Sequence, residues 1–257
     1  MTHWIRFALA DGSEGFGTLE GERIAEYHGD MFGTPQASGR TYALAELRLL
    51  SPCSPSKVIA LWNNYHQLAA RLEKAPPAHP LFMILPSTSV TGTGEAIRRP
   101  PGYAGKIVFE GELGVVIGRT CRNVSELEAG AYIFGYTCIN DVTAIEILTE
   151  DPNFPQWGRS KSFDTFTCVG PAIASQIDLA TASVLTTLDG VERQNYPLSD
   201  MIFTPAQIVS RLSADLTLCP GDVIACGTSV GVGSMKNGAR ISIAISGIGE
   251  LTNHLQA

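Results

Sequence analysis

Short apolar runs, separated by glycine- and proline-rich turns, are the main pattern along the chain and indicate a β-rich protein. The extended segments that this pattern predicts are 58–62, 81–85, 106–118, a run ending at 141, 161–174, 222–227 and 239–249. Three segments are predicted as helices: 63–74, 142–150 and 204–216. Strands and helices do not alternate regularly, so the pattern favours an α+β, mostly β protein over a repeated βαβ fold.

Two local signals add detail to this picture. Asp189-Gly190 lies between two strand-like runs in segment 183–196 and is the dipeptide of a two-residue hairpin turn. Ser125, followed three residues later by Glu128, is the signature of a helix-capping box. We therefore expect a hairpin at 183–196 and a helix start at Ser125.

The first 50 residues differ from the rest of the chain in their predicted secondary structure. They predict short strands broken by glycine turns, with a helical piece at 42–47, and a proline- and serine-rich connector follows at 51–57. The length of 257 residues is enough for a substantial core. We predict a small N-terminal β-rich domain, residues 1–50, and a larger domain, residues 51–257.

Composition and charge exclude several classes of protein. Hydrophobic residues make up 44% and charged residues 17%, which is ordinary for a globular protein. The net charge of -7 and the lack of any basic run argue against a nucleic-acid surface. No signal peptide or apolar segment of about 20 residues is present, so we expect a cytoplasmic protein with no membrane span. The six cysteines form no CxxC pair, which predicts buried free thiols and no zinc site.

Two glutamates interrupt the apolar run KIVFEGELGVVIG at 106–118. Alternation along a strand places Glu110 and Glu112 on the same face, about 6 to 7 Å apart at Cα. One interpretation is a solvated face of an antiparallel strand. The other is a cation site, because two neighbouring carboxylates repel unless a positive charge lies between them. The residues alone leave both open.

Residues 227–231, GTSVG, fit the GxSxG pattern of a serine-hydrolase nucleophile. That serine must lead from a strand into a helix, whereas the residues after Ser229 predict a glycine turn and another strand. No Asp follows Ser229, and only Glu250 and His254 remain as partners, crowded at the end of the sequence. We interpret the segment as a turn that brings backbone N–H groups and Thr228 towards a ligand.

Three other polar residues have ordinary explanations when each is taken alone. Asp141 precedes a predicted helix as a possible N-cap, although Thr143 with Glu146 could cap the same helix. Lys161 borders an apolar, aromatic run, which is a usual setting for a surface lysine with a buried stem. His66, at a strand-to-helix junction, is more often structural than catalytic.

Taken together, four motifs resemble those of the fumarylacetoacetate hydrolase superfamily, in order and spacing, over about the last four fifths of the chain: FEGELGVVIG, GYTCINDVT, KSFDTF with the VGP after it, and PGDVIACGTSVGVG. The resemblance implies a mixed β-roll or sandwich core, a small N-terminal β-rich domain and a homodimer. It also implies one divalent metal held by Glu110, Glu112 and Asp141. Three carboxylates with open positions suit Mg²⁺ or Mn²⁺ rather than zinc.

The same resemblance implies roles for residues that would contact the substrate. Lys161 would add positive charge near the substrate oxygens. The residues at substrate-binding positions are Asn64, Tyr65, Gly227 and Thr228. At one position the chain departs from the superfamily, because Ser229 stands where proline is usual.

A larger departure concerns the base. The superfamily's hydrolases carry NYxxHxxE after the first core strand, a His–Glu pair that activates water, and here those two positions hold Leu68 and Arg71. His66 and Glu73 lie nearby, but two helical turns separate them by about 10 Å, too far to bond on a regular helix. The segment 63–80 is more similar to the decarboxylase/isomerase members of the superfamily.

We therefore predict a divalent-metal-dependent enzyme that acts on a small 2-oxo or 2,4-dioxo acid by decarboxylation or keto–enol isomerisation. Both reactions need stabilisation of a metal-bound enolate more than an activated water, and His66 could serve as a weaker proton donor. Hydrolytic carbon–carbon cleavage of an acylpyruvate- or fumarylacetoacetate-type substrate is the alternative, and a catalytically silent metal-binding homologue is the second. Segments 66–80 and 149–160 would select the tail of the substrate.

Overall fold

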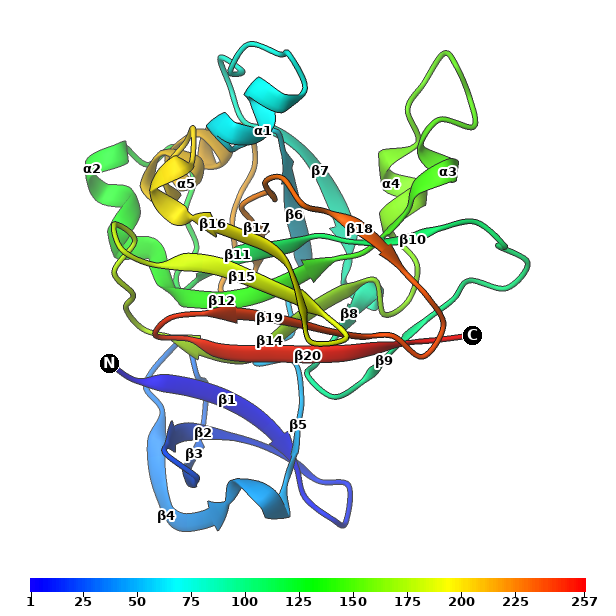
Figure 1. Ribbon diagram of the computed structural model, residues 1–257. Coiled ribbons are helices and arrows are strands. Elements are labelled where there is room, and N and C mark those ends of the chain that lie inside the picture. Colours follow the sequence, from blue (N-terminus) through cyan, green and yellow to red (C-terminus); the bar gives the residue numbers. More distant parts are fainter.

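Three β-sheets form the framework of the protein, whose computed structural model describes residues 1–257 (Figure 1). The strands are β1 (His3–Ala8), β2 (Glu14–Glu20), β3 (Arg23–His28), β4 (Gln36–Ala43), β5 (Arg48–Leu49), β6 (Lys57–Trp62), β7 (Leu81–Pro86), β8 (Val90–Thr91), β9 (Ala96–Arg98), β10 (Ile107–Phe109), β11 (Gly111–Ile117), β12 (Ile133–Asp141), β13 (Thr143–Ala144), β14 (Thr167–Ala174), β15 (Ser183–Leu188), β16 (Val191–Pro197), β17 (Val223–Ala225), β18 (Gly233–Met235), β19 (Arg240–Ile245) and β20 (Gly249–Gln256). The α-helices are α1 (His66–Arg71), α2 (Glu126–Ala129), α3 (Ile145–Leu148), α4 (Trp157–Lys161) and α5 (Pro205–Asp215). Single 3₁₀ turns are η1 (Leu44–Glu46), η2 (Ser87–Ser89), η3 (Gly130–Tyr132) and η4 (Leu198–Asp200). The predicted α+β, mostly β class is confirmed.

The largest sheet has twelve strands, and the N-terminal strands form one end of it. Its order is β4-β3-β2-β1-β14-β12-β11-β17-β6-β7, with β5 paired to β1 and β8 paired to β14. The N-terminal strands join the rest through antiparallel pairing of His3 with Ala174 and of Trp4 with Ile173. They form the lower lobe in Figure 1. This small β-rich lobe was predicted, and the exact division at residue 50 stays a prediction.

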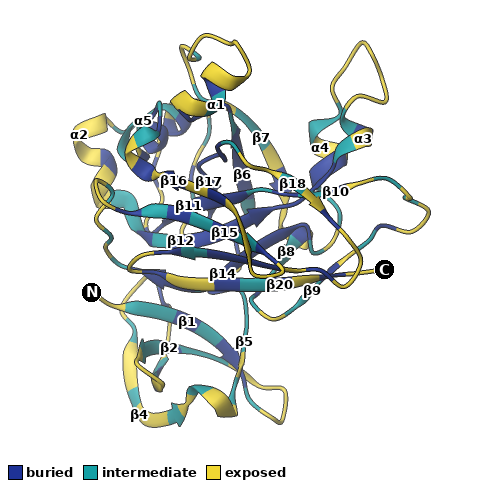
Figure 2. Ribbon diagram, in the orientation of Figure 1, coloured by how far each residue is buried: buried dark blue, intermediate teal, exposed yellow.

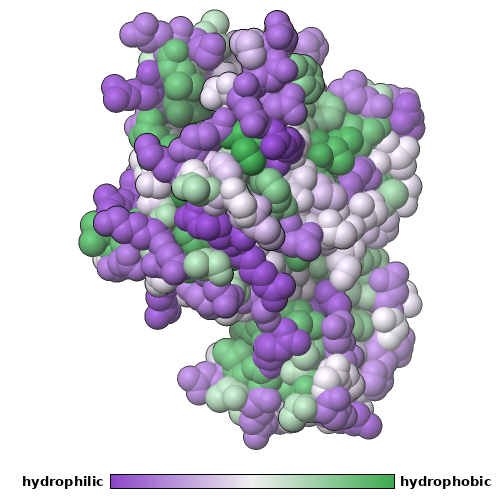
Figure 3. Space-filling view, turned by 90° about the vertical axis from the view of Figure 1, so that its right-hand side faces the viewer, coloured by the Kyte–Doolittle hydropathy of each residue, from purple (hydrophilic) through white to green (hydrophobic).

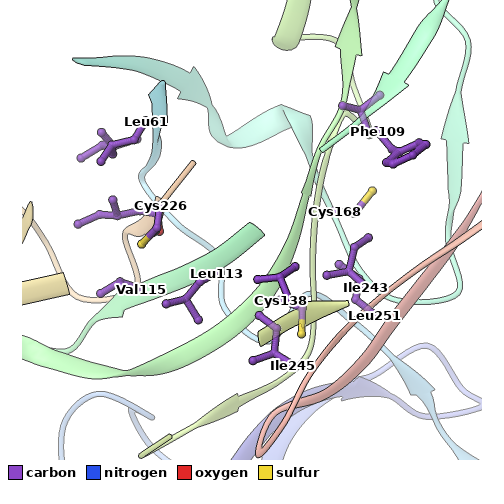
Figure 4. Packing of buried hydrophobic residues seen from close by; sticks show 14 of the residues in the cluster. Leu61, Phe109, Leu113, Val115, Cys138, Cys168, Cys226, Ile243, Ile245 and Leu251 are labelled. Atoms are coloured by element: carbon purple, nitrogen blue, oxygen red, sulfur yellow. The ribbon is translucent and has the colours of Figure 1, made fainter. Parts of the chain in front are cut away.

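The main hydrophobic core lies between the central strands of this sheet and a five-stranded sheet ordered β16-β15-β19-β20-β9. Its 39 buried residues include Leu113 of β11 and Cys138 of β12, which lie in one cluster with Ile243 and Ile245 of β19 and Leu251 of β20 (Figure 4). Burying one large aliphatic side chain contributes about 1.5–3 kcal/mol. The two sheets are therefore held face to face, as a sandwich core requires.

A second cluster of 11 buried residues covers the other face of the large sheet. Because side chains alternate across a strand, β11 directs Leu113 to the first cluster and Val116 to the second. All of β11 is consequently buried, whereas exposed residues gather on α1, α2 and several loops (Figure 2). From the side of α3 and α4, hydrophilic side chains cover much of the molecule, with scattered apolar patches (Figure 3). The strand that bears Glu112 thus lies at the centre of the fold.

The strand predicted over 106–118 is interrupted at Glu110. β10 pairs with β13 and β18 in a three-stranded sheet, whereas β11 pairs with β12 and β17 in the large sheet. The Glu110 N–H donates to Asn140 Oδ1 at 3.1 Å, and the Glu110 carbonyl accepts from the Asp141 N–H at 2.9 Å. The chain therefore passes from one sheet to another at the first of the two glutamates.

Other predicted boundaries were wrong in detail. The helical piece predicted at 42–47 is only the 3₁₀ turn η1, and the helix predicted at 142–150 is limited to α3, which follows β13. The strand predicted at 161–174 begins with the last residue of α4. The final strand, β20, had not been predicted. The 81–85 run is not a core strand, because β7 lies at the edge of the large sheet with Leu81 42% and Ile84 53% exposed. An apolar run alone does not distinguish an edge strand from a central one.

The predicted hairpin and helix cap are both present. β15 and β16 are joined by Asp189 and Gly190, whose φ angles of 52° and 78° are typical of a type I′ turn. Ser125 caps α2, where the side chains of Ser125 and Glu128 each accept a hydrogen bond from the backbone N–H of the other residue. These two local signals therefore predicted their structures correctly.

Three further predictions concern membrane-spanning helices, the cysteines and the oligomeric state. No helix of the structure combines the length and the apolar character that crossing a membrane requires. All six cysteines are free, and five of them are buried, as predicted. The homodimer that the family resemblance implies stays a prediction.

Candidate metal centre

The three carboxylates predicted as metal ligands lie together in the structure. Glu110 occupies the junction between β10 and β11, Glu112 lies on β11, and Asp141 ends β12. The antiparallel pairing of β11 with β12 sets Gly111 opposite Asn140, which brings the end of β12 beside the two glutamates. One ligand oxygen from each carboxylate lies within 4.8 Å of the others. This spacing allows a single ion to contact all three.

Burial and missing partners make this group fit a cation. Glu112 and Asp141 are 0% and 1% exposed, and the Glu112 Oε1 and Asp141 Oδ1 atoms are buried without any hydrogen-bond partner. Leaving a buried charged oxygen unsatisfied is costly. Oxygen ligands of this kind are what Mg²⁺ and Mn²⁺ prefer. The residues present therefore suit the predicted Mg²⁺ or Mn²⁺ better than an amphipathic, solvated strand face.

The same burial changes the acidity of the carboxyls. Burial, followed by the charges of Asp141 and Glu110, raises the pKa of Glu112 well above its usual range. Burial raises the pKa of Asp141 to about 6, even though the neighbouring Lys161 acts in the opposite direction. Without a cation, ionised carboxylates are thus disfavoured here, so the group is set up to gain from a bound positive charge.

Lys161, at the end of α4, is a buried cation inside this cluster. Its Nζ donates to Asp141 Oδ2 at 2.6 Å and to Glu110 Oε1 at 3.0 Å. Burial acts to lower the pKa of this ammonium, but the surrounding carboxylates outweigh burial and raise the pKa above its usual value. Lys161 is therefore a fixed positive charge and not a proton-accepting base. The surface position that its sequence context suggested is wrong.

Thr143 contributes to the cluster in a way that the sequence did not predict. The expected capping box of Thr143 with Glu146 is absent, because α3 begins after Ala144 without a side-chain cap. Thr143 Oγ1 instead donates to Glu110 Oε1 at 2.7 Å. The Glu146 carboxylate accepts from the Tyr103 hydroxyl and from the Lys106 N–H. Glu110 Oε1 is thus held by two donors, Thr143 and Lys161.

Two of the predicted substrate-binding residues hold backbone segments together. Asn64 Nδ2 donates to the Cys226 carbonyl at 2.9 Å and Asn64 Oδ1 accepts from the Phe203 N–H at 2.9 Å. The Gly227 N–H donates to Glu112 Oε2 at 2.8 Å. These groups already have partners, so their observed contacts support positioning of the centre. Direct substrate contact by either residue stays a prediction.

The other two predicted substrate-binding residues, Tyr65 and Thr228, carry hydroxyl groups. Tyr65 is fully buried with its hydroxyl unpartnered, and its ring packs edge-on against Tyr196 at 4.8 Å between centroids. Thr228 Oγ1 donates to the Gly111 carbonyl at 2.9 Å. Thr228 therefore contacts the residue between the two glutamates, whereas no hydrogen bond joins the Tyr65 hydroxyl to the carboxylate cluster.

The structure places neither half of the usual His–Glu pair beside the carboxylates. Leu68 packs against the main core, and Arg71 ends α1 as an exposed residue. His66 is exposed at the start of α1, and Glu73 follows the helix with a φ of 53°. No hydrogen bond or ion pair joins His66 to Glu73 or to the carboxylates. The departure recognised in the sequence is therefore also present in three dimensions.

Ser229 does not have the surroundings of a nucleophile. It lies in an irregular loop between β17 and β18, so no helix follows it. Its Oγ is buried without a hydrogen-bond partner, and no histidine contacts it. The interpretation of 227–231 as a glycine-rich turn is confirmed, with φ angles of 87° at Gly227 and 96° at Gly231.

Sequence reasoning missed the residues that surround Gly111. The Tyr196 hydroxyl donates to the Gly111 carbonyl, and the Gly111 N–H donates to Gln194 Oε1 at 3.0 Å. Gln194 and Tyr196 are buried residues of β16, whose neighbouring side chains at alternate positions are exposed. A glutamine on the apolar face of a strand is the one signal that could have identified this contact.

Gly111 is expected to tolerate no side chain. A Cβ at this position would lie 2.1 Å from Thr186 Oγ1 and 3.2 Å from Ile243 Cγ1. Overpacking a buried site costs about 1–3 kcal/mol, and we expect Gly111→Ala to reach the upper end because Thr186 is itself buried. Urea unfolding measures this loss. The control is Gly130→Ala, whose Cβ would meet nothing within 4 Å. Equal stability of the two variants would contradict the expectation.

Comparisons with known proteins agree with this fold. Residues 57–256 match the family described as Fumarylacetoacetate (FAA) hydrolase C-terminal, and residues 2–52 match the family described as Rv2993c-like, N-terminal. The crystal structure of 2-hydroxyhepta-2,4-diene-1,7-dioate isomerase from Mycobacterium marinum is 38% identical, with a TM-score of 0.90, covering 100% of this chain and 98% of that chain.

Two further relatives differ in their described activity. Oxaloacetate tautomerase YisK from Bacillus subtilis (strain 168) is 33% identical over 228 residues, which cover 83% of this chain and 75% of the relative. Maleylpyruvate hydrolase from Sphingobium sp. SYK-6, solved in complex with manganese(II) ion and pyruvate, is 26% identical with a TM-score of 0.81, covering 100% of this chain and 99% of that chain. With the fold, the carboxylate cluster and the matched residues in agreement, this chain belongs to the fumarylacetoacetate hydrolase family.

Proposed function

We propose that this protein is a divalent-cation-dependent keto–enol isomerase of a small 2-oxo acid. The observation that carries the proposal is the centre itself, in which two buried carboxylate oxygens lack partners beside a buried lysine ammonium. The isomerase from Mycobacterium marinum and the oxaloacetate tautomerase from Bacillus subtilis, both similar to this chain, support this class of reaction.

The residues of the chain would share the work of binding and charge stabilisation. Glu110, Glu112 and Asp141 would hold the cation, which when bound would act as a Lewis acid towards the oxygens of the 2-oxo acid. Lys161 would stabilise negative charge on the same substrate oxygens. An ammonium has three N–H donors, and the third contact of Nζ, to the Asp141 carbonyl, is long at 3.5 Å. This long third contact is the one that a substrate oxygen would replace.

Isomerisation suits this centre better than hydrolysis does. Hydrolysis requires a positioned base to deprotonate water, which is worth about 10²–10⁴-fold in rate. Leu68 and Arg71 cannot provide it, and Lys161 is held in its charged form. Interconversion of keto and enol forms instead moves one proton between carbon and oxygen while the enolate charge is stabilised. The cluster with its cation would provide that stabilisation.

A comparison of three reactions tests the proposed function. With Mn²⁺ or Mg²⁺ bound, the protein is expected to interconvert the keto and enol forms of oxaloacetate, followed by ultraviolet absorbance, faster than it cleaves acetylpyruvate to acetate and pyruvate. Loss of CO₂ from oxaloacetate, followed in the same sample, distinguishes isomerisation from decarboxylation. Faster cleavage of acetylpyruvate would refute the proposal, and so would full turnover in EDTA.

His66→Ala is expected to slow the isomerase by less than about tenfold, well short of the loss that follows removal of a positioned base. The reason is its exposure at the start of α1, where water can replace it as a proton donor. Steady-state kinetics on the enol form measure the effect. Gln67→Ala, the exposed neighbouring residue, is the control. A thousandfold loss confined to His66→Ala would show that His66 is the essential proton carrier.

A further inference from the structure

The side chain of Gln194 is buried between β11 and the loop after β17. It is 1% exposed, and both ends of its amide are engaged. Its Oε1 accepts from the Gly111 N–H at 3.0 Å, and its Nε2 donates to Thr228 Oγ1 at 2.8 Å. Nε2 also lies 3.3 Å from the carbonyl oxygens of Ser229 and Val230. One side chain thus contacts two segments far apart in sequence.

These contacts close a ring around the peptide between the two glutamates. Gln194 contacts the N–H of Gly111, Thr228 donates to the carbonyl of the same residue at 2.9 Å, and Gln194 in turn donates to Thr228. Gly111 has no side chain that could fix its orientation. The directions of the Glu110 and Glu112 side chains therefore depend on how this peptide is held.

We propose that Gln194 is a positioning residue that holds the Glu110–Glu112 segment in metal-binding geometry and joins it to the loop bearing Thr228. The inference rests on the proposed function in that a cation occupies the carboxylate cluster. It adds that the loop and the cation site are coupled, because the Gly227 N–H at the start of the same loop also donates to Glu112 Oε2. Coupling between two binding sites is reciprocal, so a ligand bound at the loop and a cation bound at the carboxylates should each change the affinity of the protein for the other.

An amide meets both demands at this position whatever the pH. The Gly111 N–H requires an acceptor and Thr228 Oγ1, which already donates to Gly111, requires a donor. An ionised carboxylate accepts but cannot donate, and it would place another negative charge beside Glu112. A leucine fills a similar volume but leaves the Gly111 N–H unsatisfied. Gln194→Leu therefore removes the polar contacts while keeping most of the packing.

The test measures metal affinity directly by titration calorimetry with Mn²⁺ as the probe. Residues that orient metal ligands typically change affinity by about 10–100-fold when replaced, and we expect Gln194→Leu to weaken Mn²⁺ binding within that range. Amide exchange of Gly111 in the metal-free protein, followed by NMR, is expected to accelerate. The proposal predicts that Thr228→Val, which removes one member of the ring, shifts both readouts in the same direction by a smaller factor.

A control separates positioning from a general loss of stability. Asn253 is also a buried amide, and its Nδ2 donates to the Gly92 and Glu95 carbonyls away from the carboxylates. Asn253→Leu is expected to lower stability and leave Mn²⁺ affinity unchanged. The inference is overturned if folded Gln194→Leu binds Mn²⁺ like the wild type. If that variant does not fold, folded Thr228→Val with wild-type Mn²⁺ affinity overturns it.

The same measurements distinguish this inference from the proposed function. If the wild type binds Mn²⁺ but does not interconvert keto and enol forms, the proposed reaction fails while the role of Gln194 is still decided by affinity. If the wild type binds no divalent cation, both fail together. If turnover is normal and affinity is unchanged in Gln194→Leu, only the inference fails.

Discussion

Glu112→Gln abolishes the stabilisation that Mn²⁺ confers and leaves the metal-free protein at least as stable as the wild type; this is the expected result with the largest consequence for the site. Glutamine has nearly the shape of a protonated glutamate and can still accept from the Gly227 N–H. Because burial disfavours the ionised form of Glu112, its loss removes little from the metal-free fold. What is lost is a ligand charge.

Thermal unfolding with and without Mn²⁺ measures this difference. A ligand at about 100 times its dissociation constant stabilises the folded state by about 2.7 kcal/mol, and this increment should disappear in Glu112→Gln together with turnover. Glu20→Gln, at an exposed carboxylate on β2, should keep both. Retention of the Mn²⁺ increment by Glu112→Gln would show that the cation binds elsewhere.

Lys161→Met is expected to act in the opposite way, by destabilising the metal-free protein and leaving it responsive to Mn²⁺. Removing one partner of a buried ion pair leaves its charge uncompensated, at a cost of about 3–5 kcal/mol. Mn²⁺ replaces the missing positive charge and should restore much of this stability. It should not restore turnover, which is expected to fall about 10²–10³-fold, as on removal of an oxyanion-stabilising donor.

A half-buried lysine, paired with a buried carboxylate away from the cluster, provides a comparison. Lys57 contacts the buried carboxylate of Asp222, which also accepts from Ser56 Oγ and the Cys219 N–H. Lys57→Met should lower stability as well, but Mn²⁺ should not restore it, and the folded fraction should turn over normally. Recovery of both variants by Mn²⁺ would mean that the ion stabilises the protein without binding at Lys161.

The carboxylate cluster could be anticipated from the sequence because two of its members follow strand periodicity. Glu110 and Glu112 are two residues apart on one face, and four motifs in the right order indicated Asp141 as the third ligand. Charge alone did not decide between a cation site and a solvated face. The structure favours the cation site, because it adds the burial of Glu112 and of Asp141.

The rest could not be foreseen, because it depends on contacts between distant segments. Its local sequence made Lys161 look like a surface residue, and only the family resemblance placed it near the substrate; its contacts with the carboxylates come from the structure. Thr143 looked like a helix cap, although its hydroxyl contacts Glu110. The exposure of β7 follows from its place at the sheet edge, which an apolar run does not encode. Gln194 lies 83 residues from Gly111, too far for any periodicity to connect them.

The way in which the N-terminal lobe joins the large sheet limits how the chain can be trimmed. β1 covers the end of β14 by main-chain pairing, and Ala172 of β14 lies in a small buried cluster with Ile5 and Phe7. A fragment starting near residue 51 would uncover both a strand edge and an apolar patch, the combination that promotes self-association. We therefore expect a fragment without the N-terminal lobe to self-associate, so residues 51–257 should be produced together with it.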